Sequence, residues 1–298
     1  MNGTDHNPEN QLHDQPQRLA FGPIHRRRAL EWMGGAGLFA LLTACGDDDG
    51  DGTVTVPPTP TPTPTPVPPP TPTPPGPEPL CVPTPPETSG PYPADGTNTA
   101  EGSTSNVLNV AGVQREDIRA SFIDTTTVAE GVQLTLTITI LAEADCAPLS
   151  GRAVYVWQAD AQGLFSLYTA PEESYLRGIG VTNADGEVKF VTIVPGCLED
   201  RYPHIYVEVF PDLFSATRGS AADLTTQLIV PADLCNAAYA DTDTYPDSAT
   251  NFADVSIDDD PVFGDDSTEE NSARTLTVGG NVSSGFVSTV SITMPAES

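Results

Sequence analysis

Five cysteines are the residues of this chain whose chemistry follows most directly from type and spacing. No two of them stand in a C-x-x-C pair, which argues against a zinc site. One of them, Cys45, belongs to the export signal described next, and an even number of cysteines in an exported chain indicates disulfide bonds. We therefore expect two disulfide bonds, whose pairing the spacing leaves open, among Cys81, Cys146, Cys197 and Cys235.

Cys45 follows a segment with the features of a bacterial export signal. Arg26 to Arg28 form a basic cluster, and Leu30 to Leu42 form an apolar run that is too short to span a bilayer as a mature helix. The run ends in Leu-Thr-Ala-Cys45, which resembles a lipobox, where the cysteine is lipidated and becomes the new N-terminus. The arginines resemble those of a twin-arginine signal. We expect a signal peptide at 1–44 and an exported cell-envelope lipoprotein; the alternative is a chance basic and apolar stretch.

Residues 45–80 have the composition of a linker. A Thr-Pro repeat runs from Thr53 to Pro79 and carries little apolar content, which predicts a disordered stalk with polyproline II character. A proline-rich ligand for an SH3-type domain is the alternative. The absence of basic residues nearby favours the stalk, which would hold a domain at 81–298 away from the membrane.

The charge of the chain excludes one class of partner. There are 12 basic and 41 acidic residues, for a formal net charge of −29, which repels nucleic acid and anionic lipid headgroups. Membrane contact is therefore expected only through the lipid anchor. In the acidic stretch 241–270, Asp241 and Asp243, or Asp258 to Asp260, could bind Ca²⁺. No EF-hand loop with its glycine and closing glutamate is present, so a solvated acidic loop is favoured.

Short strands are the elements that must position the chemistry of the domain. From Val132 to Ile140, apolar and polar residues alternate with period two, and many are β-branched, which is typical of a half-buried strand. Helical periodicity is absent from this half of the chain. The pattern predicts an all-β sandwich or barrel. Further strands are expected at Ala153–Trp157, Glu187–Val194, Ile205–Phe210, Thr225–Val230, Thr275–Val278 and Phe286–Met294.

Four motifs stand in order along the predicted β-domain. They are Thr88 to Tyr92 (T-x-G-P-Y), Val154 to Asp160 (V-x-x-W-x-A-D), Gly163 to Ser166, and Pro195 to Tyr206. Their order and spacing resemble the intradiol ring-cleavage dioxygenases, the family of protocatechuate 3,4-dioxygenase and catechol 1,2-dioxygenase. The resemblance implies a β-sandwich catalytic core, non-haem Fe(III) and a small catechol-type aromatic ligand.

The family's iron ligands are two tyrosinates and two histidines, and the resemblance maps each of them onto this chain. The tyrosine positions carry Phe165 and Leu198, which have no donor atom. The first histidine is His204 and the second is replaced by Tyr206. Arg201 keeps the position of the basic residue that stabilises bound catechol in the family. Two protein ligands would hold Fe(III) weakly, so the cofactor implied by the resemblance is expected to be lost.

Two functions follow from this ligand pattern. The favoured one is a non-catalytic intradiol dioxygenase-like domain displayed on the cell envelope, with His204 as a hydrogen-bonded core residue and Arg201 in a structural ion pair. The alternative is an active or altered Fe(III) dioxygenase that uses His204, Tyr206 and rearranged donors, of which Tyr202 and Tyr168 are nearest in sequence. The sequence does not predict an oligomeric state.

Overall fold

The structure is a computed structural model, and it describes residues 81–295. The predicted signal peptide at 1–44, the predicted lipidation of Cys45 and the predicted linker at 45–80 lie outside these residues. Within the described part, the helices are all too short or too polar to cross a membrane.

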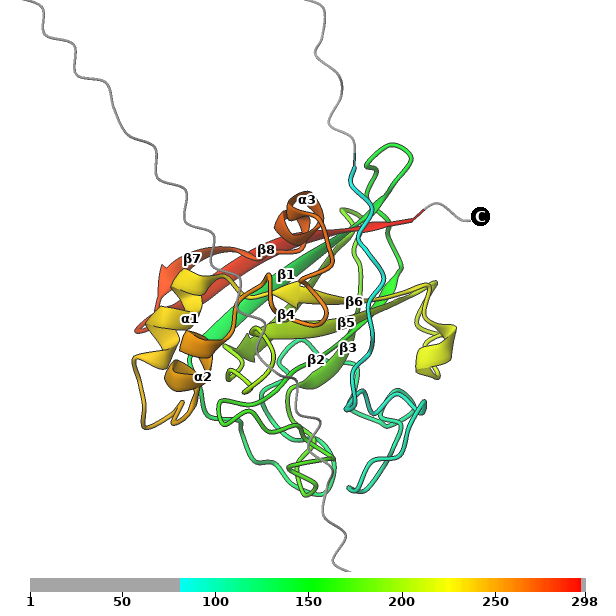
Figure 1. Cartoon of the computed structure of the whole chain (residues 1–298). Coiled ribbons are helices and arrows are strands. Elements are labelled where there is room, and N and C mark those ends of the chain that lie inside the picture. The colour runs from blue at the N-terminus through cyan, green and yellow to red at the C-terminus, as the bar shows by residue number, and fades with distance from the viewer. Residues whose placement is uncertain (1–80, 296–298) are drawn as a thin grey trace, which may run out of the picture. The chain divides into compact units, whose positions relative to one another are not determined.

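Two four-stranded sheets lie face to face (Figure 1). The first has the order β4-β1-β8-β7, with β1 at Gln133–Ala142, β4 at Glu187–Ile193, β7 at Thr277–Asn281 and β8 at Gly285–Met294. Every second residue of β1 from Leu134 to Ile140 is buried, as its alternating sequence predicts, because successive strand side chains point to opposite faces. β1 pairs antiparallel with β4 and parallel with β8.

The second sheet has the order β3-β2-β5-β6 and is antiparallel throughout. Its strands are β2 at Ala153–Trp157, β3 at Arg177–Val181, β5 at His204–Phe210 and β6 at Leu224–Ile229. β2 and β5 are buried on both faces. In β5, Ile205, Val207 and Val209 pack toward the first sheet, whereas Tyr206 and Phe210 belong to a second cluster on the outer face. Chain segments around Ala94–Val113 and Phe165–Tyr168 cover that outer face.

The predicted β-sandwich is confirmed, but two details of the prediction were wrong. β3 was not predicted, because Arg-Gly-Ile-Gly-Val has two glycines and no polar alternation. The described residues also form one turn of 3-10 helix at Gly219–Ala221 and three short α-helices: α1 at Ala232–Tyr239, α2 at Ser248–Asp254 and α3 at Thr268–Ala273. They are too short to give a helical period in the sequence. The signal that was available is the capping box of α3, in which Ser267 and Glu270 bond each other's backbone N–H groups.

One of the two expected disulfide bonds forms. Cys81 and Cys146 are bonded and tie the start of the domain to the turn after β1. The second bond does not form: Cys197 and Cys235 are both buried, and both are free thiols. Each sulfur lies near backbone carbonyls of its own segment: Cys197 contacts the carbonyl of Arg201, and Cys235 contacts that of Val230. Burial raises the pKa of both thiols to about 12, which keeps them protonated.

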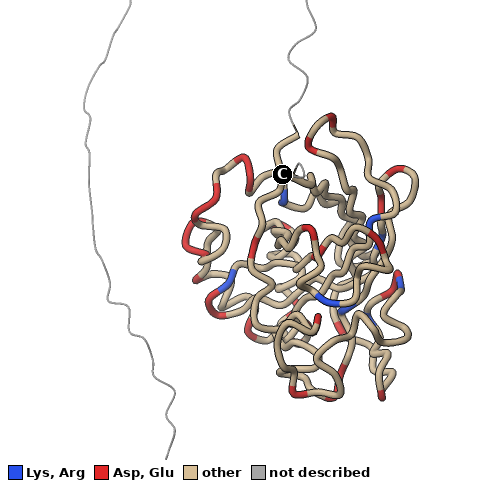
Figure 2. Tube along the Cα trace, turned by 90° about the vertical axis from the view of Figure 1, so that its right-hand side faces the viewer, with Lys and Arg blue, Asp and Glu red and all other residues tan. Residues whose placement is uncertain are grey.

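Acidic residues are spread over the whole domain and basic residues are few (Figure 2). The expectation of a solvated loop at 241–270 is wrong for Asp260, which is 5% exposed. One oxygen of Asp260 accepts hydrogen bonds from the backbone N–H groups of Val262 and Phe263, and the other accepts one from Tyr202. This carboxylate therefore organises the loop instead of facing water.

Candidate functional site

Three of the four positions mapped from the family's ligand set line one cleft. Phe165 comes from the loop after β2, Leu198 from the loop before β5, and Tyr206 from the outer face of β5 itself. The cleft has a volume of about 420 Å³. Its other lining residues are Pro91, Tyr92, Gly163, Thr169, Glu199, Asp200 and Arg201.

Aromatic rings form much of the wall of this cleft. The centroid of Tyr92 lies 4.8 Å from that of Phe165 and 5.1 Å from that of Tyr168. Tyr206 stacks on Trp157 with 4.9 Å between centroids and an interplanar angle of 4°. Such contacts fix the rings in place, because each aromatic pair adds to the free energy gained by burial.

Gly90 of the T-x-G-P-Y motif closes over the ring of Tyr206. A Cβ at position 90 would lie 2.5 Å from the Tyr206 hydroxyl oxygen, and Gly90 has a φ of +64°. Both facts restrict the position to glycine. Tyr206 is 2% exposed and its hydroxyl is hydrogen-bonded by Arg201. Burial raises the pKa of Tyr206, so this phenol keeps its proton at neutral pH.

His204 lies behind Tyr206 and is not among the residues that line the cleft. Its ring meets the ring of Tyr206 edge-on, with 4.6 Å between centroids. Nδ1 lies 2.6 Å from the carbonyl oxygen of Tyr202, which can only accept, so Nδ1 carries the proton and Nε2 is a lone-pair acceptor. Nε2 is buried and has no hydrogen-bond partner. Burial, with the nearby charge of Arg201, lowers the pKa of His204 to about 3.

Arg201 both lines the cleft and holds the loop before β5. Its Nε lies 3.0 Å from Oδ2 of Asp260, whose side chain is fully buried, and its Nη2 donates to Gln227 at 2.6 Å. The predicted structural ion pair is therefore present, and its partner Asp260 lies in the acidic stretch.

The two tyrosines nearest in sequence to the mapped positions lie elsewhere. The Tyr168 hydroxyl accepts from the backbone N–H of Ala94 and donates to Asn98, and its ring lines a neighbouring pocket of about 490 Å³ with Tyr92. Tyr202 packs its ring against Phe252 at 5.5 Å, outside the cleft.

A family model described as dioxygenase matches residues 107–205, which is less than half of the chain. Two solved structures each align with 72% of this chain and with 95% of their own chain. One is an intradiol ring-cleavage dioxygenase from Tetranychus urticae, with 20% sequence identity and a TM-score of 0.54. The other is a second dioxygenase, with 21% sequence identity and a TM-score of 0.53. The domain has the intradiol dioxygenase fold. A dioxygenase domain from a carbohydrate-binding fusion protein of Streptomyces sp. SirexAA-E is 23% identical over 72% of this chain and 100% of its own, with a TM-score of 0.43. The curated protein sequences contain no match.

Intradiol dioxygenases normally use non-haem Fe(III), and the residues of this chain do not fit that ion. Phe165 and Leu198 present hydrocarbon to the cleft, and the Tyr206 phenol keeps its proton and bonds Arg201. Only Nε2 of His204 is a free donor among the four mapped positions. Within residues 81–295 no three His, Cys, Asp or Glu side chains are grouped so that they could hold a metal ion. The cleft also has the Tyr92 phenol and the carboxylates of Glu199 and Asp200 in its lining, but none of these stands at a mapped ligand position.

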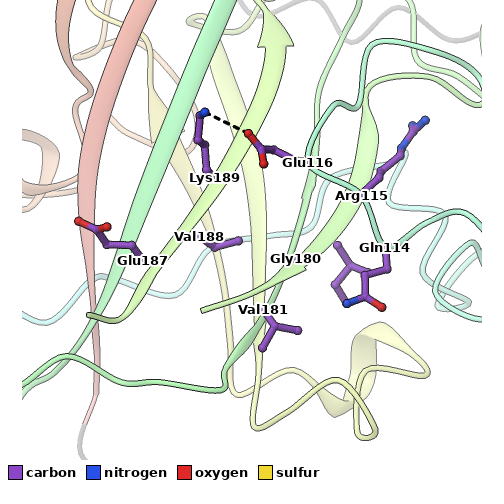
Figure 3. A pocket seen from close by; sticks show the side chains of 9 residues that line it. Gln114, Arg115, Glu116, Gly180, Val181, Glu187, Val188 and Lys189 are labelled. Carbon is purple, nitrogen blue, oxygen red and sulfur yellow. Dashed lines mark ion pairs between the residues drawn. The ribbon is translucent and has the colours of Figure 1, made fainter. Parts of the chain in front are cut away.

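Another hollow, of about 390 Å³, lies between β3 and β4 (Figure 3). Lys189 and Glu116 point toward one another across it and form an ion pair at 3.0 Å. Arg115 donates to the backbone carbonyls of Arg177 and Ala120. Lys189, Glu116 and Arg115 thus find their partners within the protein, so this hollow offers a ligand fewer free polar groups than the aromatic cleft does.

Sequence reasoning missed a buried carboxyl pair, one member of which, Glu208, lies on β5 as Tyr206 does. Asp95 and Glu208 are 0% and 1% exposed, and Oδ2 of Asp95 and Oε2 of Glu208 both lack a donor. Burial, and next the charge and hydrogen bond of Asp95, raise the pKa of Glu208 to about 9. Glu208 therefore keeps a proton at neutral pH, which its carboxyl group can donate to Asp95. The available signal was a single acidic residue inside the apolar strand HIYVEVF.

Proposed function

We propose that the domain is a non-catalytic binding module with the intradiol dioxygenase fold, which holds a small catechol-type aromatic ligand in the cleft. The observation that carries this proposal is the meeting of Phe165, Leu198 and Tyr206 in one cleft. The substituted positions thus lie together where the family's iron would be bound. The surrounding residues Gly90, Trp157 and Arg201 are the same as in the family's motifs.

The cleft has the features of a site for an aromatic ring. Its volume of about 420 Å³ is in the range of small-molecule sites, which are mostly apolar with a few polar groups that orient the ligand. Tyr92 and Phe165 supply aromatic surface for stacking. Arg201 supplies N–H groups near the Tyr206 hydroxyl, where the hydroxyl groups of a catechol could be oriented.

We also propose that the module is exported and held on the cell envelope by lipid at Cys45. The basic cluster, the apolar run and the cysteine that ends it support this location, and the Thr-Pro repeat would set the module away from the membrane. Substituting Cys45→Ser should abolish labelling by a palmitate analogue in a bacterial host and release the protein from the membrane fraction. Unchanged labelling would contradict the proposal.

Metal analysis and oxygen consumption separate binding from catalysis. The purified protein should carry far less than one iron per chain, lack a tyrosinate-to-iron absorption band and take up no O₂ with catechol after incubation with Fe(III). Near-stoichiometric iron, with O₂ uptake that His204→Ala abolishes, would instead establish the altered dioxygenase.

Calorimetric titration with catechol under argon tests the binding site. Leu198→Trp should block the cleft and abolish the binding heat, because Leu198 lines the cleft and is only partly buried. Leu213→Trp, at a position 38% exposed and outside the cleft, is the matched control and should bind as the wild type does. Equal binding by the two variants would place the ligand elsewhere.

A further inference from the structure

The mouth of the aromatic cleft is acidic. Glu199 and Asp200, both exposed, follow directly on Leu198 and line the cleft. The same two residues also line an adjoining pocket of about 240 Å³, together with Asp254, Asp259 and Asp260. The two pockets therefore share a rim of carboxylates, with further carboxylates on its far side.

Positive charge does not balance this rim. Among the described residues that line the two pockets, Arg201 alone is basic. Its guanidinium group is paired at 3.0 Å with Asp260, whose side chain is fully buried. The charge of Arg201 is thus offset inside the protein, and Glu199 and Asp200 keep an uncompensated negative charge at the mouth of the cleft. Carboxylates within a Debye length of a bound group act on it without direct contact.

The walls and the mouth together suit one kind of ligand. Tyr92 and Phe165 provide aromatic surface for an apolar body, and ring faces also attract cations through their quadrupole. The carboxylates of Glu199 and Asp200 attract a positive group and repel a negative one. A ring that carries a carboxylate would meet like charge at the mouth, whereas a ring that carries an ammonium group would meet opposite charge.

We propose that the cleft selects a cationic aromatic ligand, one that places its ring among Tyr92, Phe165 and Tyr206 and its amine at the rim formed by Glu199 and Asp200. The proposal rests on the proposed binding function and deepens it. It assigns the ring to the apolar walls and the selectivity to the two exposed carboxylates.

Three ligands that share a catechol ring and differ in charge test this selectivity. They are dopamine as the cation, ethylcatechol as the neutral ligand and dihydroxyphenylacetate as the anion, titrated calorimetrically into the full-length mature protein under argon. Dopamine should bind about tenfold more tightly than ethylcatechol, as expected for one favourable charge contact, and dihydroxyphenylacetate should bind most weakly. The preference for dopamine should shrink as salt is added, because the carboxylates at the rim are exposed.

Charge variants locate the source of the preference. The double substitution Glu199→Gln with Asp200→Asn should bring the ratio of dopamine to ethylcatechol affinity toward one. Because both affinities are measured on the same variant, a loss of folded protein does not alter their ratio. The control is Asp185→Asn with Glu187→Gln, at exposed positions outside the cleft, which changes the net charge equally and should keep the preference.

The outcomes separate this proposal from the one on which it rests. Equal affinity for dopamine and ethylcatechol, or tightest binding of dihydroxyphenylacetate, would overturn the cationic selectivity while leaving aromatic binding established. If both double variants lose the preference for dopamine equally, the preference comes from the net charge of the protein, and the role of the rim is overturned. Failure of all three ligands to bind would overturn the proposed function itself.

Discussion

The outer face of β5 carries two polar sites that differ in what covers them. His204 and Tyr206 lie beside the cleft, whereas Glu208, two residues further along the same face, is sealed against Asp95 near Gly219. At the cleft, hydrocarbon replaces the oxygen donors and the remaining imidazole stays neutral. At the sealed site, two carboxyl groups remain, and the raised pKa of Glu208 keeps a proton on its carboxyl group. An open cleft tolerates the loss of donors because water or a ligand can fill it, whereas a sealed polar group must be satisfied by the protein.

Restoring the donors at the cleft should give the largest effect. The triple variant Phe165→Tyr, Leu198→Tyr and Tyr206→His adds two phenol groups and one imidazole to the free Nε2 of His204. Bound iron should rise from trace to near-stoichiometric amounts, with a visible tyrosinate-to-iron absorption band, because Fe(III) prefers such donors. Iron content by mass spectrometry and the absorption spectrum measure this.

The double variant Phe165→Tyr with Leu198→Tyr is the control for this restoration. It keeps Tyr206, so one imidazole ligand stays missing and less iron should be retained. A folded triple variant that stays free of iron would show that more than the ligand residues separates this cleft from the family's metal site.

The sealed site should make stability depend on pH. The pKa of Glu208 is about 9 in the folded state against 4.5 for an ordinary glutamate. A raised pKa means that the folded state holds the proton, so the contribution to stability is complete below pH 4.5 and declines as the pH rises toward 9. By pH 7 this loss amounts to about 3 kcal/mol of unfolding free energy. Urea unfolding at a series of pH values measures it.

Glu208→Gln should remove most of this pH dependence and raise the unfolding free energy at pH 7 relative to the wild type, because an amide can donate to Asp95 without a bound proton. Glu101→Gln, at an exposed position, is the control and should keep the slope of the wild type. Parallel pH profiles for the wild type and Glu208→Gln would contradict the raised pKa of Glu208.

A smaller effect is expected where Gly90 covers Tyr206 at the cleft. Gly90→Ala should lower the unfolding free energy by about 2 kcal/mol, through the positive φ and through the clash with the phenol ring. Gly151→Ala is a matched control, because Gly151 has a φ of +82° and a Cβ there would meet no atom within 4 Å. The difference between the two variants in urea unfolding reports the contact with Tyr206. Equal losses would mean that the ring moves aside freely.

Alternation of apolar and polar residues predicted most of the strands, but not which strands pair with one another in the sheets. Burial alternates along β1 from Gln133 to Ile140 and along β8 from Gly285 to Ile292, so it could be predicted from the period of two. The parallel pairing of β1 with β8 joins the first and the last strand of the domain, and no local pattern encodes it. Likewise, the sequence predicted four bonded cysteines, but only the packing decides which sulfur atoms come within bonding distance.

The candidate site could be predicted as a set of residues but not as a geometry. The order of the motifs mapped Phe165, Leu198 and Tyr206 from the sequence alone. Residue type shows directly that the first two have no donor atom and that the third has a phenol where the family has an imidazole. The rim at Glu199 and Asp200 was not predicted, although these residues adjoin Leu198, since an acidic pair gains meaning only beside aromatic walls. The partner of Arg201 was also hidden, because Asp260 belongs to a distant acidic stretch.

By itself, the sequence determined the class of fold, the order of the motifs and the absence of phenolate donors at two mapped positions, because these depend on residue type and local period. The tertiary structure decided that three substituted positions meet in one cleft, that His204 keeps an unpartnered nitrogen behind Tyr206, and that Glu208 is buried against Asp95. Proton positions and charge balance depend on which groups are removed from water together, and only the packed chain determines that.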